Sequence, residues 1–162
     1  MKTSIRPLEE NDKDVIRTIL KDAQMFRDDE IEVAIEVIDE YLDDPVESDY
    51  WSYVTVDERN KVAGFAVIGP NPMTIGTFDL YWIVVDQSRQ RKGVGSQLLE
   101  FAEERVIEHK GRLIIAETSS KPLYLRTRNF YKQQGYSELA QIHDYYDVGD
   151  DLIIFGKYLK EV

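Results

Sequence analysis

The residues whose types and spacing point most clearly to chemistry form the segment Gln90-Arg91-Lys92-Gly93-Val94-Gly95-Ser96. The apolar and β-branched residues 80–85 before it predict a buried strand, and apolar residues at helical spacing predict a helix over 94–110. Glycines let the backbone approach a ligand closely, and the first turn of a helix presents amide groups and the positive end of a dipole. A strand, a basic glycine turn and a helix in this order predict a site for a phosphate group.

Two sequence patterns indicate which phosphate-containing ligand this segment binds. The segment lacks the third glycine of the dinucleotide fingerprint and the Gly-Lys-Ser/Thr of nucleotide-phosphate loops. Its Gln-x-x-Gly-x-Gly pattern resembles instead the coenzyme A pyrophosphate loop of the GNAT family of N-acetyltransferases. The segment Phe130-Tyr131-Lys132-Gln133-Gln134-Gly135-Tyr136 is similar to that family's C-terminal motif, Phe-Tyr-x-x-x-Gly-(Phe/Tyr), and follows in the family's order. The resemblance implies one GNAT domain over residues 1–162.

The resemblance also implies the cofactor, acetyl-CoA with CoA as product, and no metal. In the family the loop amides hold the pyrophosphate, to which Arg91 and Lys92 would add charge-assisted contacts. Backbone groups of the strand are expected to meet the pantetheine arm and to polarise the thioester carbonyl. Gln87 stands where many relatives have proline, which is expected to loosen the turn. The implied cofactor contacts are Ile83, Val84, Val85, Gln90, Arg91, Lys92, Gly93, Val94, Gly95, Ser96, Tyr124, Thr127 and Tyr131.

Three side chains are candidates for proton transfer. By its place in the family motif, Tyr131 is the candidate general acid, a phenol that protonates the leaving thiolate. Tyr124, Thr127 and Tyr131 have i, i+3 and i+7 spacing, which predicts one shared helix face. Glu117 ranks first as the base and Asp79 second, acting directly or through water. The alternatives are a core aromatic for Tyr131 and, for the carboxylates, solvent exposure or pairing with Arg126 or Arg128.

Composition excludes several other functions. The chain has 162 residues, enough for one domain with a core, and no cysteine, so disulfides, thiol catalysis and zinc–thiolate sites are excluded. His109 and His143 lack a second histidine nearby, so we expect no metal site at either. We find no signal peptide or membrane span, so we expect a cytoplasmic protein without a membrane partner. A net charge of −11 argues against nucleic acid.

The order of predicted elements indicates the fold class. Alternation and periodicity predict strands over 2–7, 51–57, 62–68, 77–86, 112–118, 136–142 and 152–159, and helices over 12–23, 28–44, 94–110 and 120–134. Residues 69–72 should break the sheet, Ser119 or Ser120 should cap the last helix, and the polar segment 144–151 should join the last strands. A helix crossover makes the strands 77–86 and 112–118 parallel. We therefore expect a mixed α/β fold, a mostly antiparallel sheet with a central parallel strand pair and flanking helices.

Two functions remain open at this point. The first is an acetyl-CoA-dependent N-acetyltransferase that moves the acetyl group directly to a primary amine of a small molecule or peptide. Acidic residues in 28–44 and 144–151, with Asp79 and Glu117, favour a cationic acceptor, although such residues also simply solvate a surface. The alternative is a non-catalytic acyl-CoA-binding sensor or interaction module. The acceptor, a donor other than acetyl-CoA and a homodimer remain open.

Overall fold

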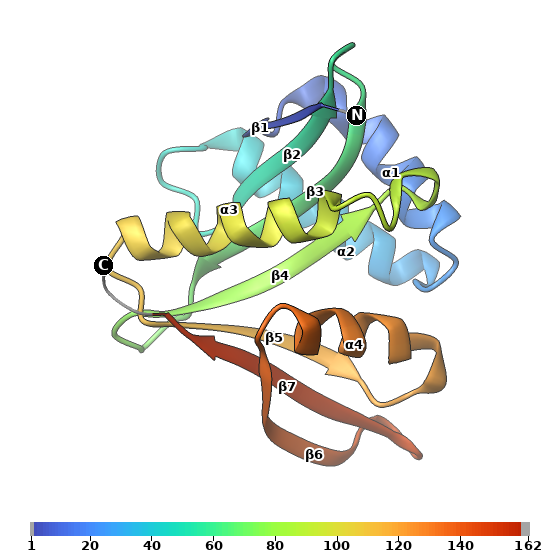
Figure 1. Cartoon of the computed structure of the whole chain (residues 1–162), viewed down its shortest axis with the longest axis vertical. Helices are drawn as coiled ribbons and strands as arrows, with labels where there is room; N and C mark the ends of the chain where they lie inside the picture. The colour runs from blue at the N-terminus through green and yellow to red at the C-terminus, as the bar shows by residue number, and fades with distance from the viewer. Residues whose placement is uncertain (1, 160–162) are drawn as a thin grey trace. The chain divides into compact units, whose positions relative to one another are not determined.

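The computed structural model describes residues 2–159 and contains a seven-stranded sheet in the order β1-β2-β3-β4-β5-β7-β6 (Figure 1). The sheet is mostly antiparallel, and β4 and β5 form its parallel pair, which confirms the predicted fold class. The strands are β1 (Thr3–Pro7), β2 (Trp51–Asp57), β3 (Val62–Pro70), β4 (Thr77–Val85), β5 (Leu113–Ser119), β6 (Ser137–Asp147) and β7 (Asp150–Tyr158). The helices are α1 (Lys13–Asp22), α2 (Asp28–Asp43), α3 (Val94–Glu108) and α4 (Leu125–Gln133), with short 3-10 turns η1 (Glu10–Asp12), η2 (Gln87–Arg89) and η3 (Pro122–Tyr124).

Contacts divide the chain into two compact units. Unit 1 holds the residues up to Gly69 together with Tyr81–Glu104, and unit 2 holds Pro70–Leu80 together with the residues from Arg105 onward. The chain passes from one unit to the other within β4 and again within α3. Among the described residues, no helix is both long and apolar enough to cross a membrane.

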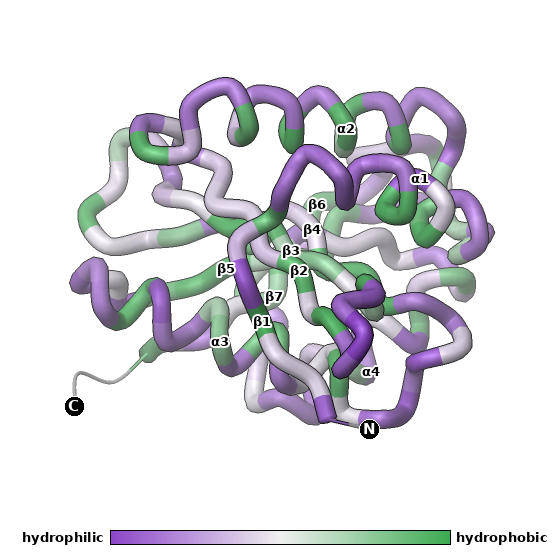
Figure 2. Tube along the Cα trace, turned by 90° about the horizontal axis from the view of Figure 1, so that it is seen from above, coloured by the Kyte–Doolittle hydropathy of each residue, from purple (hydrophilic) through white to green (hydrophobic). Residues whose placement is uncertain are grey.

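The core of unit 1 follows from the spacing of apolar residues on its helices. Ile16 and Leu20 on α1 and Ile31, Ala34 and Ile38 on α2 recur at three- and four-residue intervals and are buried at 2% exposure or less. They belong to one apolar cluster that includes alternate residues of β2 and β3. Figure 2 shows the hydrophobic turns of α2 on its inner side and hydrophilic ones on its outer side. The helix α3 packs on the other face of β2.

The other face of β2 is marked by Tyr53, whose ring meets Phe101 of α3 edge-on with centroids 4.9 Å apart. Its neighbour Val54 is fully buried in the α1–α2 cluster. Because successive strand residues point to opposite faces, the two contacts place α3 opposite α1 and α2 within unit 1. This layering holds the end of β4 and the start of α3 on a packed support.

The core of unit 2 is aromatic. In Figure 1, α4 lies across β5 and β7. The Tyr131 ring of α4 stacks on Phe155 of β7 with centroids 5.6 Å apart, and Tyr136 lies at the same distance from Tyr131. Ile114 and Ala116 of β5 are buried as well. Tyr131 therefore contributes to the core as the alternative interpretation proposed.

Most predicted bounds differ from the structure by one or two residues, and four differences have a structural cause. The strand β3 continues to Pro70, so the segment 69–72 breaks the sheet later than expected. The N-cap of η3 is Lys121, because Ser119 still belongs to β5 and its hydroxyl instead accepts a hydrogen bond from the Lys121 amide at 3.1 Å. Tyr124 lies in η3 rather than in the helix that follows. The segment 144–151 is mostly strand.

The β6–β7 hairpin explains the last difference. Its register shifts between Ile142 and Asp147, so β6 carries extra residues there before the turn at Val148 and Gly149. The Asp151 carboxylate holds this irregularity by accepting hydrogen bonds from the Asp144 amide at 2.9 Å and the Gln141 side chain at 2.7 Å. Polar residues that resemble a loop therefore form an irregular strand fixed by side-chain hydrogen bonds.

Candidate functional site

The segment 90–96, called here the basic loop, joins η2 to the start of α3. Its backbone turns through the left-handed region twice, at Arg91 with φ of 62° and at Gly93 with φ of 82°. A Cβ atom added to Gly93 would meet nothing within 4 Å, so the backbone is open to a ligand there. The first intrahelical bond of α3 runs from the Gln97 amide to the Gly93 carbonyl at 3.0 Å. A helix start beside a glycine turn is the geometry that binds phosphate.

The strand that leads into the basic loop is fixed from β3. A Cβ atom at Gly64 would lie 2.8 Å from the Val84 carbonyl oxygen, so only glycine fits against this part of β4. The Asp86 amide donates to the Ala63 carbonyl at 2.9 Å, directly after the strand ends. The parallel ladder with β5 covers Thr77–Asp79 of β4 and ends before Ile83, Val84 and Val85. These three residues, predicted to contact the cofactor through their backbones, thus lie beyond that ladder.

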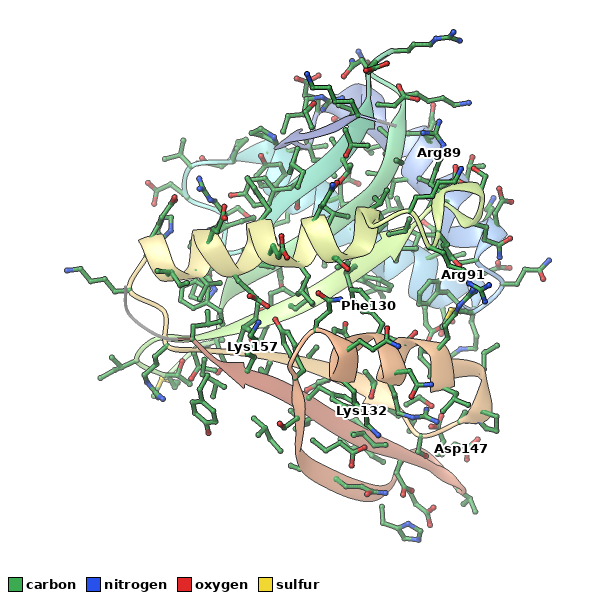
Figure 3. All side chains as sticks on the ribbon, in the orientation of Figure 1. Arg89, Arg91, Phe130, Lys132, Asp147 and Lys157 are labelled. Atoms are coloured by element: carbon green, nitrogen blue, oxygen red, sulfur yellow. The ribbon has the colours of Figure 1, made fainter. Side chains whose placement is uncertain are left out.

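Two carboxylates stabilise the turn η2 through hydrogen bonds, although the sequence predicted a loose turn there. The Asp86 carboxylate accepts hydrogen bonds from the Ser88 amide and the Ser88 hydroxyl, both at 2.8 Å. The Arg89 guanidinium donates to Asp57 at 2.9 Å. Figure 3 shows Arg89 and Arg91 on the segment that joins β4 to α3. Sequence reasoning missed Asp57 and Arg89, because 32 residues separate them.

Tyr131 is a buried phenol, with 4% of the residue's surface exposed. Burial raises its pKa well above the usual range of tyrosine, so the group keeps its proton at every physiological pH. Of the residues predicted to share its helix face, Thr127 lies on α4 and is half-buried, whereas Tyr124 stands at the N-cap before that helix. Tyr131 therefore carries a protonated hydroxyl. Of the three residues predicted to share a helix face, only Thr127 and Tyr131 lie on α4.

Asp79 and Glu117 lie close together in unit 2. Asp79 pairs with Ile115 in the parallel ladder, so Glu117, two residues further along β5, points to the same face as both. Glu117 is exposed at the surface, but partial desolvation by its neighbours, and then the negative charge of Asp79, raises its pKa. Asp79 accepts a hydrogen bond from the Asn71 side chain at 2.8 Å. Asp79 is the third residue of β4, and two residues of β5 follow Glu117, so Asp79 lies near the start of its strand and Glu117 near the end of its own.

Arg128, a predicted partner of these carboxylates, bonds elsewhere. Its guanidinium donates to the carbonyl oxygens of Ser119 at 2.7 Å and Lys121 at 2.9 Å, and so holds the end of β5 to η3. Glu117 forms no ion pair with any of the residues 2–159. Its carboxylate is therefore available to a proton or a cationic ligand.

Tyr146 is a member of this cluster that sequence reasoning missed. Partial burial raises its pKa to about 12, with the charge of Glu117 as the next cause and Asp150 and the phenols of Tyr145 and Tyr124 contributing less. Its ring meets that of Tyr145 edge-on at 5.0 Å. The sequence predicted a polar connection over 144–151, and only the irregular strand shows where Tyr146 lies. The pair of adjacent tyrosines, Tyr145 and Tyr146, was the available signal.

The helix α2 carries less net negative charge at its surface than its acidic sequence suggests. Glu32 pairs with Arg17 of α1, and Asp39 lies 2.5 Å from the ammonium of Lys13. Such surface pairs contribute little stability, but they offset part of the negative charge of α2. The carboxylates of unit 2 are therefore the stronger candidates for attracting a cation.

The hairpin also brings His143 beside two carboxylates. Its ring nitrogens lie 3.3 Å from Asp144 and 3.1 Å from Asp151, and donor atoms of the three residues lie within 4.8 Å of one another. Sequence reasoning did not predict this group, because the residues meet only through the irregular register of β6. Asp151 also accepts the hydrogen bonds that hold the hairpin, so the arrangement has a structural role.

Comparisons with known proteins identify the family of the chain. The family model of the acetyltransferase (GNAT) domain matches residues 48–138. A crystal structure of a Desulfovibrio desulfuricans protein assigned to the GNAT family of acetyltransferases is 35% identical, with a TM-score of 0.93 over 97% of this chain and 99% of that chain. The chain belongs to the GNAT family of acetyltransferases. A comparison with curated proteins gives no match.

Two further solved structures share the fold. The ribosomal-protein-S18-alanine N-acetyltransferase from Escherichia coli is 20% identical, with a TM-score of 0.77 over 99% of this chain and 96% of its own. An aminoglycoside 6'-N-acetyltransferase in complex with coenzyme A is 19% identical, with a TM-score of 0.75 over 96% of each chain. At these identities the likeness concerns the fold alone.

Proposed function

We propose that the two units form one GNAT domain that transfers an acetyl group from acetyl-CoA directly to a primary amine of a small molecule or peptide. The observation that carries this proposal is the basic loop, whose two left-handed residues and open Gly93 precede the first turn of α3. A relative with the same fold holds coenzyme A. The residues fit the donor, because backbone amides and two cationic side chains suit a pyrophosphate.

The binding roles follow from the sequence prediction and this geometry. Amides of the basic loop hold the pyrophosphate, with Arg91 and Lys92 adding charge. The backbone of Ile83–Val85, beyond the end of the parallel ladder, orients the pantetheine arm and polarises the thioester carbonyl. Tyr124 and Thr127 add side-chain contacts. The donor supplies the activated acetyl group, and the protein supplies orientation and charge stabilisation.

The catalytic roles concern two protons. Glu117 accepts the proton that an ammonium acceptor must lose before its nitrogen attacks the acetyl carbon, and a raised pKa suits a base of this kind. Tyr131 donates its proton to the departing sulfur, and its raised pKa ensures that the proton is present. Asp79 raises the pKa of Glu117 and is the second candidate for the base.

The acceptor is a cationic amine. This assignment is supported by the carboxylates of Glu117 and Asp79 on one face of the sheet and by the phenol of Tyr146 beside Glu117. Carboxylates attract a cation and tyrosine rings bind one through their faces. The named acceptors of the two more distant relatives, a ribosomal-protein alanine and an aminoglycoside, are likewise amines.

The decisive variant is Tyr131→Phe, assayed by thiol release from acetyl-CoA with a panel of amines and basic peptides. The ring that stacks on Phe155 is kept, so the fold and CoA binding should persist while kcat falls about 100-fold or more. Tyr136→Phe is the matched control, because it removes a second buried phenol from the same cluster and should keep its turnover. Equal turnover in the Tyr131→Phe variant and the wild type would exclude the acid role. CoA binding by a wild type that acetylates no amine would favour the non-catalytic module.

A further inference from the structure

One ion pair joins Arg89, the residue just before the basic loop, to a distant hairpin. The Arg89 guanidinium, at the end of η2, donates from Nη2 to Oδ2 of Asp57 at 2.9 Å. The side chains are only 18% and 14% exposed, less than those of most ion pairs in this protein. Asp57 ends β2, so the contact joins the turn after β4 to the β2–β3 hairpin within unit 1.

Asp57 is a rigid anchor because the hairpin holds its other oxygen. Its Oδ1 accepts hydrogen bonds from the amides of Arg59 at 2.9 Å and Lys61 at 3.0 Å. These backbone bonds, led by the one from Lys61, and the bond from Arg89 lower the pKa of Asp57 to about 2. The carboxylate is therefore charged at every pH at which the protein would be assayed. One oxygen orders the hairpin, and the other orients Arg89.

The loop beyond Arg89 needs such an anchor. Gln87 supplies no proline to stiffen the turn, and two of the next residues, Arg91 and Gly93, take left-handed conformations. On the α3 side the backbone is fixed by the helix itself. On the η2 side, the Arg89 side chain forms the hydrogen bond to Asp57 that connects the turn to β2.

We infer that Asp57 is a positioning residue, which fixes the basic loop through Arg89 so that its amides meet the donor pyrophosphate. The inference rests on the proposed function, since it assigns a role in the binding of the same donor. Ligand-binding groups need support from surrounding residues to stay within about 0.5 Å of their productive geometry. A residue that touches no ligand therefore controls donor affinity.

The alternative is that Arg89 itself binds the phosphate, with Asp57 competing for its charge. The two explanations predict opposite signs for Asp57→Asn. Removing a negative charge near an anion site strengthens binding by Coulomb attraction alone, and it would release Arg89 to the ligand. If Asp57 instead positions the basic loop, Asp57→Asn weakens CoA binding even though the site becomes more positive. The sign of the change therefore identifies the role.

The test compares two donors. In Asp57→Asn we expect the KM for acetyl-CoA and the CoA Kd from titration calorimetry to rise roughly tenfold, with kcat retained. S-acetyl-N-acetylcysteamine has the acetyl thioester but no pyrophosphate, so its kcat/KM should stay unchanged. Glu58→Gln is the matched control, since it removes the same charge from the adjacent, exposed position of the hairpin.

Three results would overturn the inference. These are unchanged or tighter CoA binding by Asp57→Asn, an equal loss with both donors, and an equal loss in Glu58→Gln. A wild-type protein that binds no CoA would instead refute the proposed function, and calorimetry on the wild type separates that outcome from the others.

Discussion

Arg91 stands in the basic loop with a φ of 62°, in the left-handed region that non-glycine residues rarely occupy. Its side chain is exposed, so no packing compensates for this conformation. Strained residues of this kind persist at functional sites when the side chain is needed there. Replacing Arg91 by glycine should therefore stabilise the fold and weaken donor binding at the same time.

The expected changes in Tm and in CoA affinity follow from the backbone conformation and the charge of Arg91. Placing a side chain in the left-handed region costs about 1 kcal/mol relative to glycine, which corresponds to a rise in Tm of about 2–4 °C for a chain of this length. A hydrogen bond to a charged group contributes about 1.5 kcal/mol at the lower end, the value suited to an exposed arginine. Its loss should weaken CoA binding about tenfold.

The assay is a thermal melt with and without CoA, combined with titration calorimetry. Without ligand, Arg91→Gly should have a higher Tm than the wild type. Its Tm should rise less than that of the wild type when CoA is added. Arg91→Lys keeps the charge and the strain, and should match the Tm of the wild type. Lys92→Ala should lose CoA affinity without the gain in Tm, because Lys92 lies outside the left-handed region. A lower Tm for Arg91→Gly, or an unchanged CoA Kd, would refute this reasoning.

The remaining predictions concern the carboxylates of unit 2. The raised pKa of Glu117 means that its charged form destabilises the folded state, so stability is lost as pH rises through that pKa. Glu117→Gln should therefore melt above the wild type at pH 7 to 8, with a gain that shrinks on acidification, while kcat/KM falls; a lower Tm at neutral pH would contradict this. Asp79→Asn removes the like charge and should move the acidic limb of the pH–rate profile to lower pH; an unmoved limb would assign the base to another group. For a cationic acceptor, kcat/KM should fall as ionic strength rises through about 0.1 M, and less steeply in Glu117→Gln; a rate indifferent to salt would exclude electrostatic attraction of the acceptor.

Periodicity predicted the elements whose pattern depends on burial. The helix α2 ends before Pro45 as expected, and β2 has the predicted bounds, Trp51–Asp57. The parallel pair β4–β5 follows from the crossover through α3. The bounds of α2 and β2 depend on neighbouring residues only, where local sequence and global packing favour the same structure. The parallel pair depends on the general handedness of such crossovers.

Contacts between distant residues could not be predicted in this way. The pairing of Arg89 with Asp57 depends on where the β2–β3 hairpin lies beside β4, which no local spacing encodes. Tyr146 lies near Glu117 because the register of β6 shifts after Ile142, and a register shift leaves no periodic signal. The raised pKa of Glu117 depends on partial desolvation and on the parallel partner of its strand. Such features are visible only after the chain is folded.

The distribution of these residues has a consequence for mutagenesis. The basic loop, Gly64, Asp57 and Arg89 belong to unit 1, whereas Tyr131, Glu117 and the other proton-transfer candidates belong to unit 2. Each set is held by contacts within its own unit, the ion pair and the β3 contact in one and the aromatic stack and the parallel ladder in the other. Substitutions at residues that are held by separate contacts and share no partner are usually additive. Asp57→Asn combined with Tyr131→Phe should therefore show the CoA affinity of the first variant and the kcat of the second, since donor binding and proton transfer depend on separate supports.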